Sequence, residues 1–232
     1  MQFITSEKEF DTIVSQAKGL VNISADFPNA LLHPGSDKEI FLTFDELRMS
    51  LFFNHLQDFL RTIDVSEFIY VVLDPSPDDY GVERIEKFKA LKSTLSDTKE
   101  DFLNALNEYS GGGRPDCIMD DSNRIFVSTM KYDWCILGDR DSDLAFCYFS
   151  TPHLRSSFKD AYGADILNAE TAINYAWPLK SNPGLREKFS QIIFRILIVA
   201  KKRGVLLKYR LLTPKFQYVL NINSRPSGRH ND

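Results

Sequence analysis

Three short runs of apolar and β-branched residues follow one another at positions 124–129, 134–138 and 144–149. Only the segments MKYD and DRDSD separate them, and connections this short are typical of neighbouring antiparallel strands. Both alternating faces of each run are apolar, for example Trp134 and Ile136 against Cys135 and Leu137. Helices are therefore needed on both faces of the sheet. The sequence predicts an α+β fold with a central antiparallel sheet covered by helices.

A fourth strand is predicted at 68–73, inside the run EFIYVVLD. Pro75 and Pro77 follow it and prevent its continuation. The expected sheet thus comprises residues 68–73, 125–127, 134–137 and 144–149. A chain of 232 residues with 18 Phe and 9 Tyr has the length and the apolar material for one large core. We expect a single domain over 1–222 and a disordered tail at 223–232, where NSRPSGRHND has no large apolar side chain.

Helices are predicted from capping residues and from apolar residues at helical spacing. Capping-box pairs with a partner three positions later begin at Ser6, Thr43 and Asp97, and they predict helices over about 6–19, 43–61 and 97–106. Apolar spacing alone predicts further helices at 82–92 and 166–175. The C-terminal part of the fold is predicted to be a helix at 182–202 and a hairpin of 205–212 with 216–222.

Charge and cysteine content restrict the class of protein. Lys and Arg number 28 against 32 Asp and Glu, so the chain lacks the basic field that non-specific nucleic-acid binding requires. The charge is uneven, because 97–143 is mostly acidic and 201–229 contains Lys and Arg but no acid. Such asymmetry is typical of a surface that binds a partner. The three cysteines form no CxxC pair, and no signal peptide or membrane-length apolar segment occurs, so we expect a cytosolic protein that binds neither nucleic acid nor membrane.

Common catalytic and cofactor motifs do not occur. The glycines at 111–113 lack the lysine of a phosphate-binding loop, and no HExxH, GxSxG or dinucleotide fingerprint is found. Pro115 and Asp116 resemble the start of a nuclease motif, but no acid-x-Lys follows in 124–131. His55 lies among apolar residues of a predicted helix, which favours a hydrogen-bonded core or boundary residue over a ligand. We expect no cofactor and no metal.

The segment DRDSD at 139–143 has the densest charge beside apolar runs and admits three interpretations. Asp139, Asp141 and Asp143 match the first, third and fifth ligands of a calcium loop, but the required Gly and Glu are replaced by Leu144 and Ser150. A tight hairpin turn, with aspartates accepting local backbone N–H bonds, is the second interpretation.

The third interpretation is a binding or catalytic edge formed by Asp139, Arg140, Asp141 and Asp143. Paired carboxylates near a buried Trp can acquire pKa values suited to proton transfer, with His153 as the nearest histidine in sequence. A thiol dyad of Cys147 and His153 is formally possible, but Cys147 alternates with aromatic residues inside a predicted strand and fits a core position better.

Four segments together resemble a known group of proteins: YVVLDPSPDDY, FLNALNEYSGGG, PDCIMDDSNRIFV and YDWCILGDRDSDLAF, all within 70–149. They are similar to small bacterial cytosolic proteins of uncharacterised families, some of which are grouped with immunity proteins of polymorphic toxin systems. The resemblance implies a protein partner such as a basic toxin domain, and it carries over no catalytic residue. The basic region after Lys201 departs from that picture.

The sequence therefore predicts a non-enzymatic protein-binding module of the toxin-neutralising kind, with Asp139, Arg140, Asp141 and Asp143 as partner-binding residues. The alternative is a hydrolase or transferase with an acidic site near Asp139, Asp141 and His153. A perturbed pKa in a pocket that is lined by at least two of these side chains would favour the enzyme.

Overall fold

The computed structural model describes residues 1–22, 40–80, 87–109 and 117–175, together with positions 181, 183, 184, 187 and 188. All of them belong to one compact unit, Met1–Ile196. The predicted C-terminal hairpin and the tail at 223–232 lie outside the described residues, as does nearly all of the helix predicted at 182–202.

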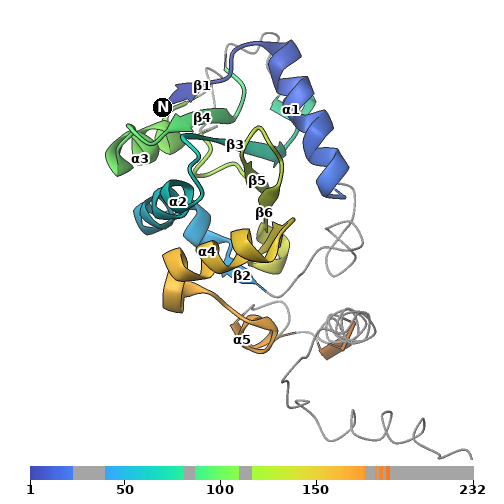
Figure 1. Cartoon of the computed structure of the whole chain (residues 1–232). Helices are drawn as coiled ribbons and strands as arrows, with labels where there is room; N and C mark the ends of the chain where they lie inside the picture. The colour runs from blue at the N-terminus through green and yellow to red at the C-terminus, as the bar shows by residue number, and fades with distance from the viewer. Residues whose placement is uncertain are drawn as a thin grey trace, which may run out of the picture. The chain divides into compact units, whose positions relative to one another are not determined.

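A seven-stranded antiparallel sheet forms the centre of the described part (Figure 1). Its order is β1-β4-β3-β5-β6-β7-β2, and every neighbouring pair is antiparallel. The strands are β1 (Gln2–Phe3), β2 (Phe41–Thr43), β3 (Glu67–Asp74), β4 (Ala90–Thr94), β5 (Arg124–Ser128), β6 (Trp134–Asp139) and β7 (Leu144–Phe149). The predicted α+β class and the four predicted strands are confirmed.

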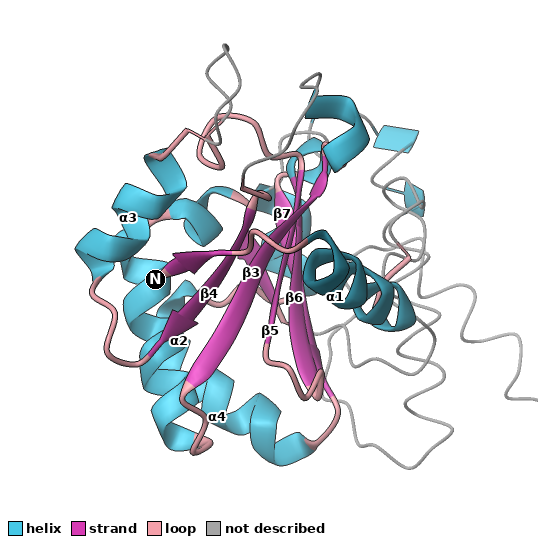
Figure 2. Ribbon diagram, turned by 90° about the horizontal axis from the view of Figure 1, so that it is seen from above, coloured by secondary structure: helices cyan, strands magenta, loops and turns pink. Residues whose placement is uncertain are grey.

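Helices cover both faces of the sheet, as the apolar alternation predicts. Figure 2 shows α1 (Glu7–Leu20) on one side and α2 (Ser50–Thr62), α3 (Lys99–Asn107) and α4 (Pro152–Tyr162) on the other. Alternate residues of β6 enter two different cores: Trp134 and Ile136 lie with α2 and α4, whereas Cys135 and Leu137 lie with α1. The Trp134 ring packs edge-on against Phe59 of α2, with the ring centroids 5.2 Å apart.

Local capping explains where α1 and α3 begin. Ser6 Oγ accepts a hydrogen bond from the Glu9 backbone N–H at 3.4 Å, and α1 continues one residue past Gly19 to Leu20. The cap of α3 is Thr98 with Asp101, one position after the predicted pair. Asp97 does not cap α3, because its carboxylate accepts hydrogen bonds from Thr94 N and Ser93 Oγ, which precede it.

The helix predicted over 43–61 is divided into two elements. Thr43 and Glu46 do form reciprocal hydrogen bonds, but they hold a separate 3-10 turn, η1 (Asp45–Arg48). Met49 then adopts an extended conformation, and α2 begins at Ser50. The break lets Leu47 of η1 lie directly against Gly138 of β6, where a side chain on residue 138 would collide with it.

One further prediction needs correction, and one helix was not predicted. The helix predicted at 82–92 is wrong over its last residues, because Ala90–Thr94 form β4. Ala90 lies in the core beside α1 and Leu91 lies in the core beside α2, as expected for successive residues of a strand. In so short a segment the same apolar residues also fit helical spacing, which is why a helix was predicted. The segment after β7 forms a helix that was not predicted, α4, with Thr151 as N-cap and Pro152 in its first turn.

Candidate functional site

Strand register brings several charged segments together at one end of the sheet. Asp74 at the end of β3 pairs with Arg124, Arg124 pairs with Asp139, and Asp139 pairs with Leu144. Thr43 at the end of β2 also pairs with Leu144. The elements that follow or precede these ends are η1, η2 (Pro77–Tyr80), the segment 117–123 and the turn 139–143. We call this region the acidic end of the sheet.

The DRDSD segment is the hairpin turn between β6 and β7, as its second interpretation states. A short 3-10 turn, η3 (Arg140–Ser142), is followed by Asp143 in the left-handed conformation at φ 57°. Asp139 is only 1% exposed, and its carboxylate accepts hydrogen bonds from Ser142 N and Arg124 Nε, both at 3.0 Å. Asp139 therefore closes the turn, and Arg124 on the neighbouring strand neutralises it.

Arg140 connects the turn to other parts of the acidic end. Its guanidinium lies 5.4 Å from the centre of the Phe44 ring and donates to the Asp120 carbonyl at 3.2 Å. Arg48 of η1 repeats this arrangement, at 5.1 Å from the same ring and 2.7 Å from the Met119 carbonyl. Partial burial and the nearby Arg48 lower the pKa of Arg140. The two arginines thus hold the segment 117–123 against η1.

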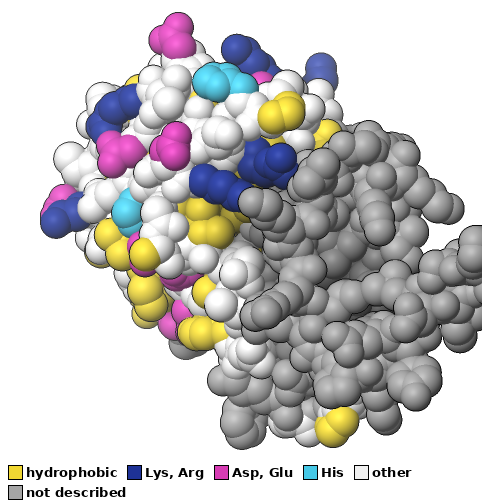
Figure 3. Space-filling model, turned by 60° about the horizontal axis from the view of Figure 1, so that its bottom comes forward, with side chains coloured by type: hydrophobic (Ala, Val, Ile, Leu, Met, Phe, Trp, Pro, Cys, Tyr) yellow, Lys and Arg dark blue, Asp and Glu magenta, His cyan; other side chains and the backbone are white. Residues whose placement is uncertain are grey.

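Exposed charge at the acidic end is mainly negative. The exposed carboxylates there belong to Asp45, Asp78, Asp79, Asp120 and Asp141. Four cations beside them form ion pairs: Arg48 with Asp45, Lys87 with Glu108, Lys89 with Asp121, and Arg124 with Asp139. Lys89 is only 1% exposed. On the face shown in Figure 3, by contrast, Lys and Arg side chains are interspersed with Asp and Glu.

An exposed aromatic residue borders these carboxylates. Tyr175, the last residue of α5 (Ala169–Tyr175), is 47% exposed. Partial burial raises the pKa of its hydroxyl, and the nearby carboxylates of Asp143, Asp45 and Glu46 raise it further. Tyrosine is enriched in protein interfaces because it offers a large contact area with a polar tip.

A histidine–aspartate pair lies close to the acidic end and was not predicted. His55 Nε2 of α2 is 3.0 Å from Asp165 Oδ2, and the His55 ring lies 5.1 Å from the Tyr162 ring. Burial raises the pKa of neighbouring Glu46, against the hydrogen bonds from Thr43. The prediction that His55 is a hydrogen-bonded core or boundary residue is confirmed, because it is half-buried and bonded to Asp165. Its partner is 110 positions away, so no local pattern indicates the pair.

The structure separates the residues of the predicted enzymatic alternative. Asp139 and Asp141 precede β7, whereas His153 lies exposed in the first turn of α4, after the other end of that strand. A strand of 6 residues spans about 20 Å. Cys147 is fully buried, and burial raises its pKa well above the usual value, which disfavours the reactive thiolate.

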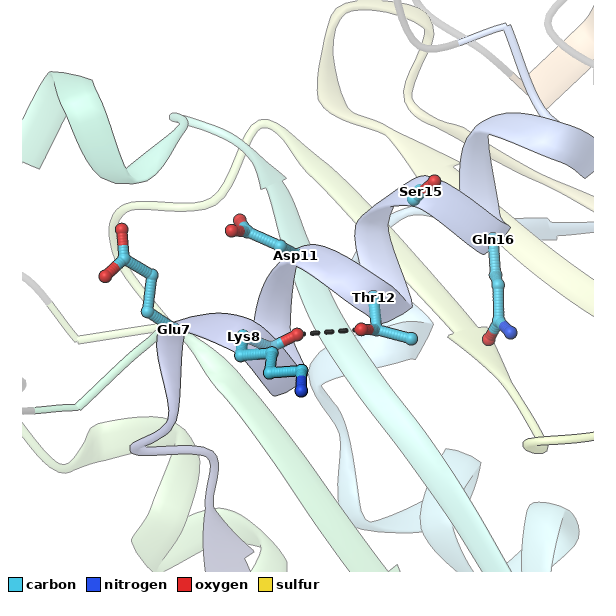
Figure 4. Close-up of a pocket in the computed structure, with 6 residues that line it drawn as sticks. All are labelled: Glu7, Lys8, Asp11, Thr12, Ser15 and Gln16. Carbon is cyan, nitrogen blue, oxygen red and sulfur yellow. Dashed lines mark hydrogen bonds between the residues drawn. The ribbon is translucent and has the colours of Figure 1, made fainter.

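A shallow, open depression lies along the outer side of α1. Figure 4 shows Glu7, Lys8, Asp11, Thr12, Ser15 and Gln16 around it. The dashed contact in Figure 4 is local to the helix, because Thr12 Oγ1 donates to the Lys8 carbonyl four residues earlier, at 2.7 Å. All lining residues come from one helix, and the side chains do not converge on a common point. This surface is the solvated face of an amphipathic helix.

Within the described ranges, no three His, Cys, Asp or Glu side chains are arranged to hold a metal ion. Among the same residues no helix has the length and apolar character to cross a bilayer. Partner binding by Asp139, Arg140, Asp141 and Asp143 stays a prediction, although their environments differ: Asp139 is buried, Arg140 and Asp143 are half-buried, and Asp141 is exposed. Comparison with known proteins gives no matching family model, no matching curated protein and no matching solved structure.

Proposed function

We propose that this chain is a protein-binding module that recognises a basic protein partner through the acidic end of its sheet, in the manner of a toxin-neutralising immunity protein. The observation that carries the proposal is the excess of exposed carboxylates at one end of the sheet, where Arg48, Lys89 and Arg124 each already form an ion pair. The resemblance of 70–149 to uncharacterised bacterial families, some of which are grouped with immunity proteins, supports it.

Electrostatics explains why such a surface favours association. Charges of one sign on one side of a protein steer an oppositely charged partner toward it and raise the association rate by about 10- to 1,000-fold at low salt. Asp141 at the tip of the hairpin turn is exposed, so it is free to contact a partner without disturbing the pair that Asp139 forms with Arg124. Tyr175 adds an aromatic contact beside these carboxylates.

The partner is to be captured from a lysate of the source cells on immobilised protein at low ionic strength, where steering is strongest. The recovered protein is then purified, and its association rate is measured against wild type and two variants. The test variant carries Asp78→Asn, Asp120→Asn and Asp141→Asn, all exposed and all at the acidic end. The control carries Asp11→Asn, Asp64→Asn and Glu67→Gln, which are exposed elsewhere and change the net charge by the same amount.

We expect the test variant to associate at least about tenfold more slowly at low salt and to show a flatter salt dependence. The control should remain close to wild type, because its substitutions lie on α1 and near the opposite end of β3. Equal slowing of both variants would mean that only net charge matters, and the assigned surface would be wrong. A partner with a negative net charge, or failure to recover any partner, would overturn the proposal itself.

Neutralisation of a toxin is tested separately, by expressing the recovered partner alone and together with this chain. Growth arrest by the partner, relieved by the wild type and less by the test variant, is the expected result. A partner that is harmless to the cell would leave a binding module of another kind and exclude the immunity function.

A further inference from the structure

We draw no further inference here: the strongest candidate, the buried polar atoms of Arg48, Tyr70 and Arg140 that lack a hydrogen-bond partner beneath the acidic end of the sheet, carries nothing, because both guanidinium groups lie over the Phe44 ring with carboxylates nearby, and nothing among the described residues shows what ligand these atoms would bind.

Discussion

Replacing Gly138 by alanine adds one carbon at the contact between β6 and η1, and so tests whether η1 packs against β6 at the acidic end of the sheet. A Cβ atom at residue 138 would lie 2.4 Å from Leu47 Cδ1 and 3.1 Å from Phe44 Cδ2, both closer than van der Waals contact. Leu47 belongs to η1, which also carries Asp45 and Arg48. Gly138→Ala should therefore displace η1 from β6 and shift Asp45 and Arg48, the residues that η1 contributes to the acidic end.

The expected cost follows from the two contacts. Overpacking a filled core by one carbon costs about 1 to 3 kcal/mol. The Leu47 methyl is the end of a flexible side chain and can rotate away, which alone would place the cost near the lower limit. Phe44 is less free to move, because Arg48 and Arg140 both lie over its ring. We therefore expect the free energy of unfolding to fall by about 2 kcal/mol.

Urea denaturation followed by circular dichroism measures this change, with an unaltered slope indicating that only stability has changed. Gly19→Ala is the matched control, because nothing lies within 4 Å of a Cβ there and alanine in a helix gains up to about 1 kcal/mol over glycine. Leu47→Ala should cost about 2 to 5 kcal/mol alone, but less than additively in combination with Gly138→Ala, since it provides the missing space. Wild-type stability for Gly138→Ala, or strict additivity in the double variant, would refute the packing of η1 on β6.

Three further predictions concern the core, the turn and a half-buried carboxylate. Trp134→Ala should cost about 3 to 5 kcal/mol, because the side chain is fully buried against Phe59; an unchanged denaturation midpoint would instead place it at the surface. Asp139→Ala should cost about 3 to 5 kcal/mol by leaving the Arg124 guanidinium without its buried carboxylate, whereas exposed Asp141→Ala should stay within about 0.5 kcal/mol; equal effects in thermal unfolding would contradict the assigned roles. Burial raises the pKa of the Glu46 carboxyl, so the folded state binds the Glu46 proton more tightly than the unfolded state does. The protonated carboxyl therefore stabilises the fold below the unfolded pKa near 4.5, and this stabilisation is lost as pH rises through the pKa of the folded state. Glu46→Gln keeps an acceptor for Thr43 N, so its stability relative to wild type should increase from pH 4 to about pH 7 in urea titrations, and a pH-independent difference would show that Glu46 titrates alike in both states.

The sheet was predictable because residues close together in the sequence determine its hairpins and its two apolar faces. The segments MKYD and DRDSD leave room for nothing longer than a hairpin connection, and the apolar residues on both faces of 134–137 require cover from two sides. The structure has both features. The short pattern at 82–92 failed for the opposite reason, because five apolar positions fit a helix and a buried strand alike, and only pairing with β3 makes 90–94 a strand.

The candidate site was predictable only in part. The sequence by itself determined that 139–143 is a charged turn between two strands, since turn chemistry depends on adjacent residues. It could not distinguish buried Asp139 from exposed Asp141, because that difference depends on Arg124, which strand pairing places beside Asp139. Tertiary structure alone joined His55 to Asp165 and gathered Asp45, Asp78, Asp120 and Asp141 at one end of the sheet. The aspartates come together because the strands that carry their turns pair in antiparallel register, and His55 meets Asp165 because α2 packs against α4, the helix just before Asp165. No local pattern of residues encodes contacts between elements so distant in sequence.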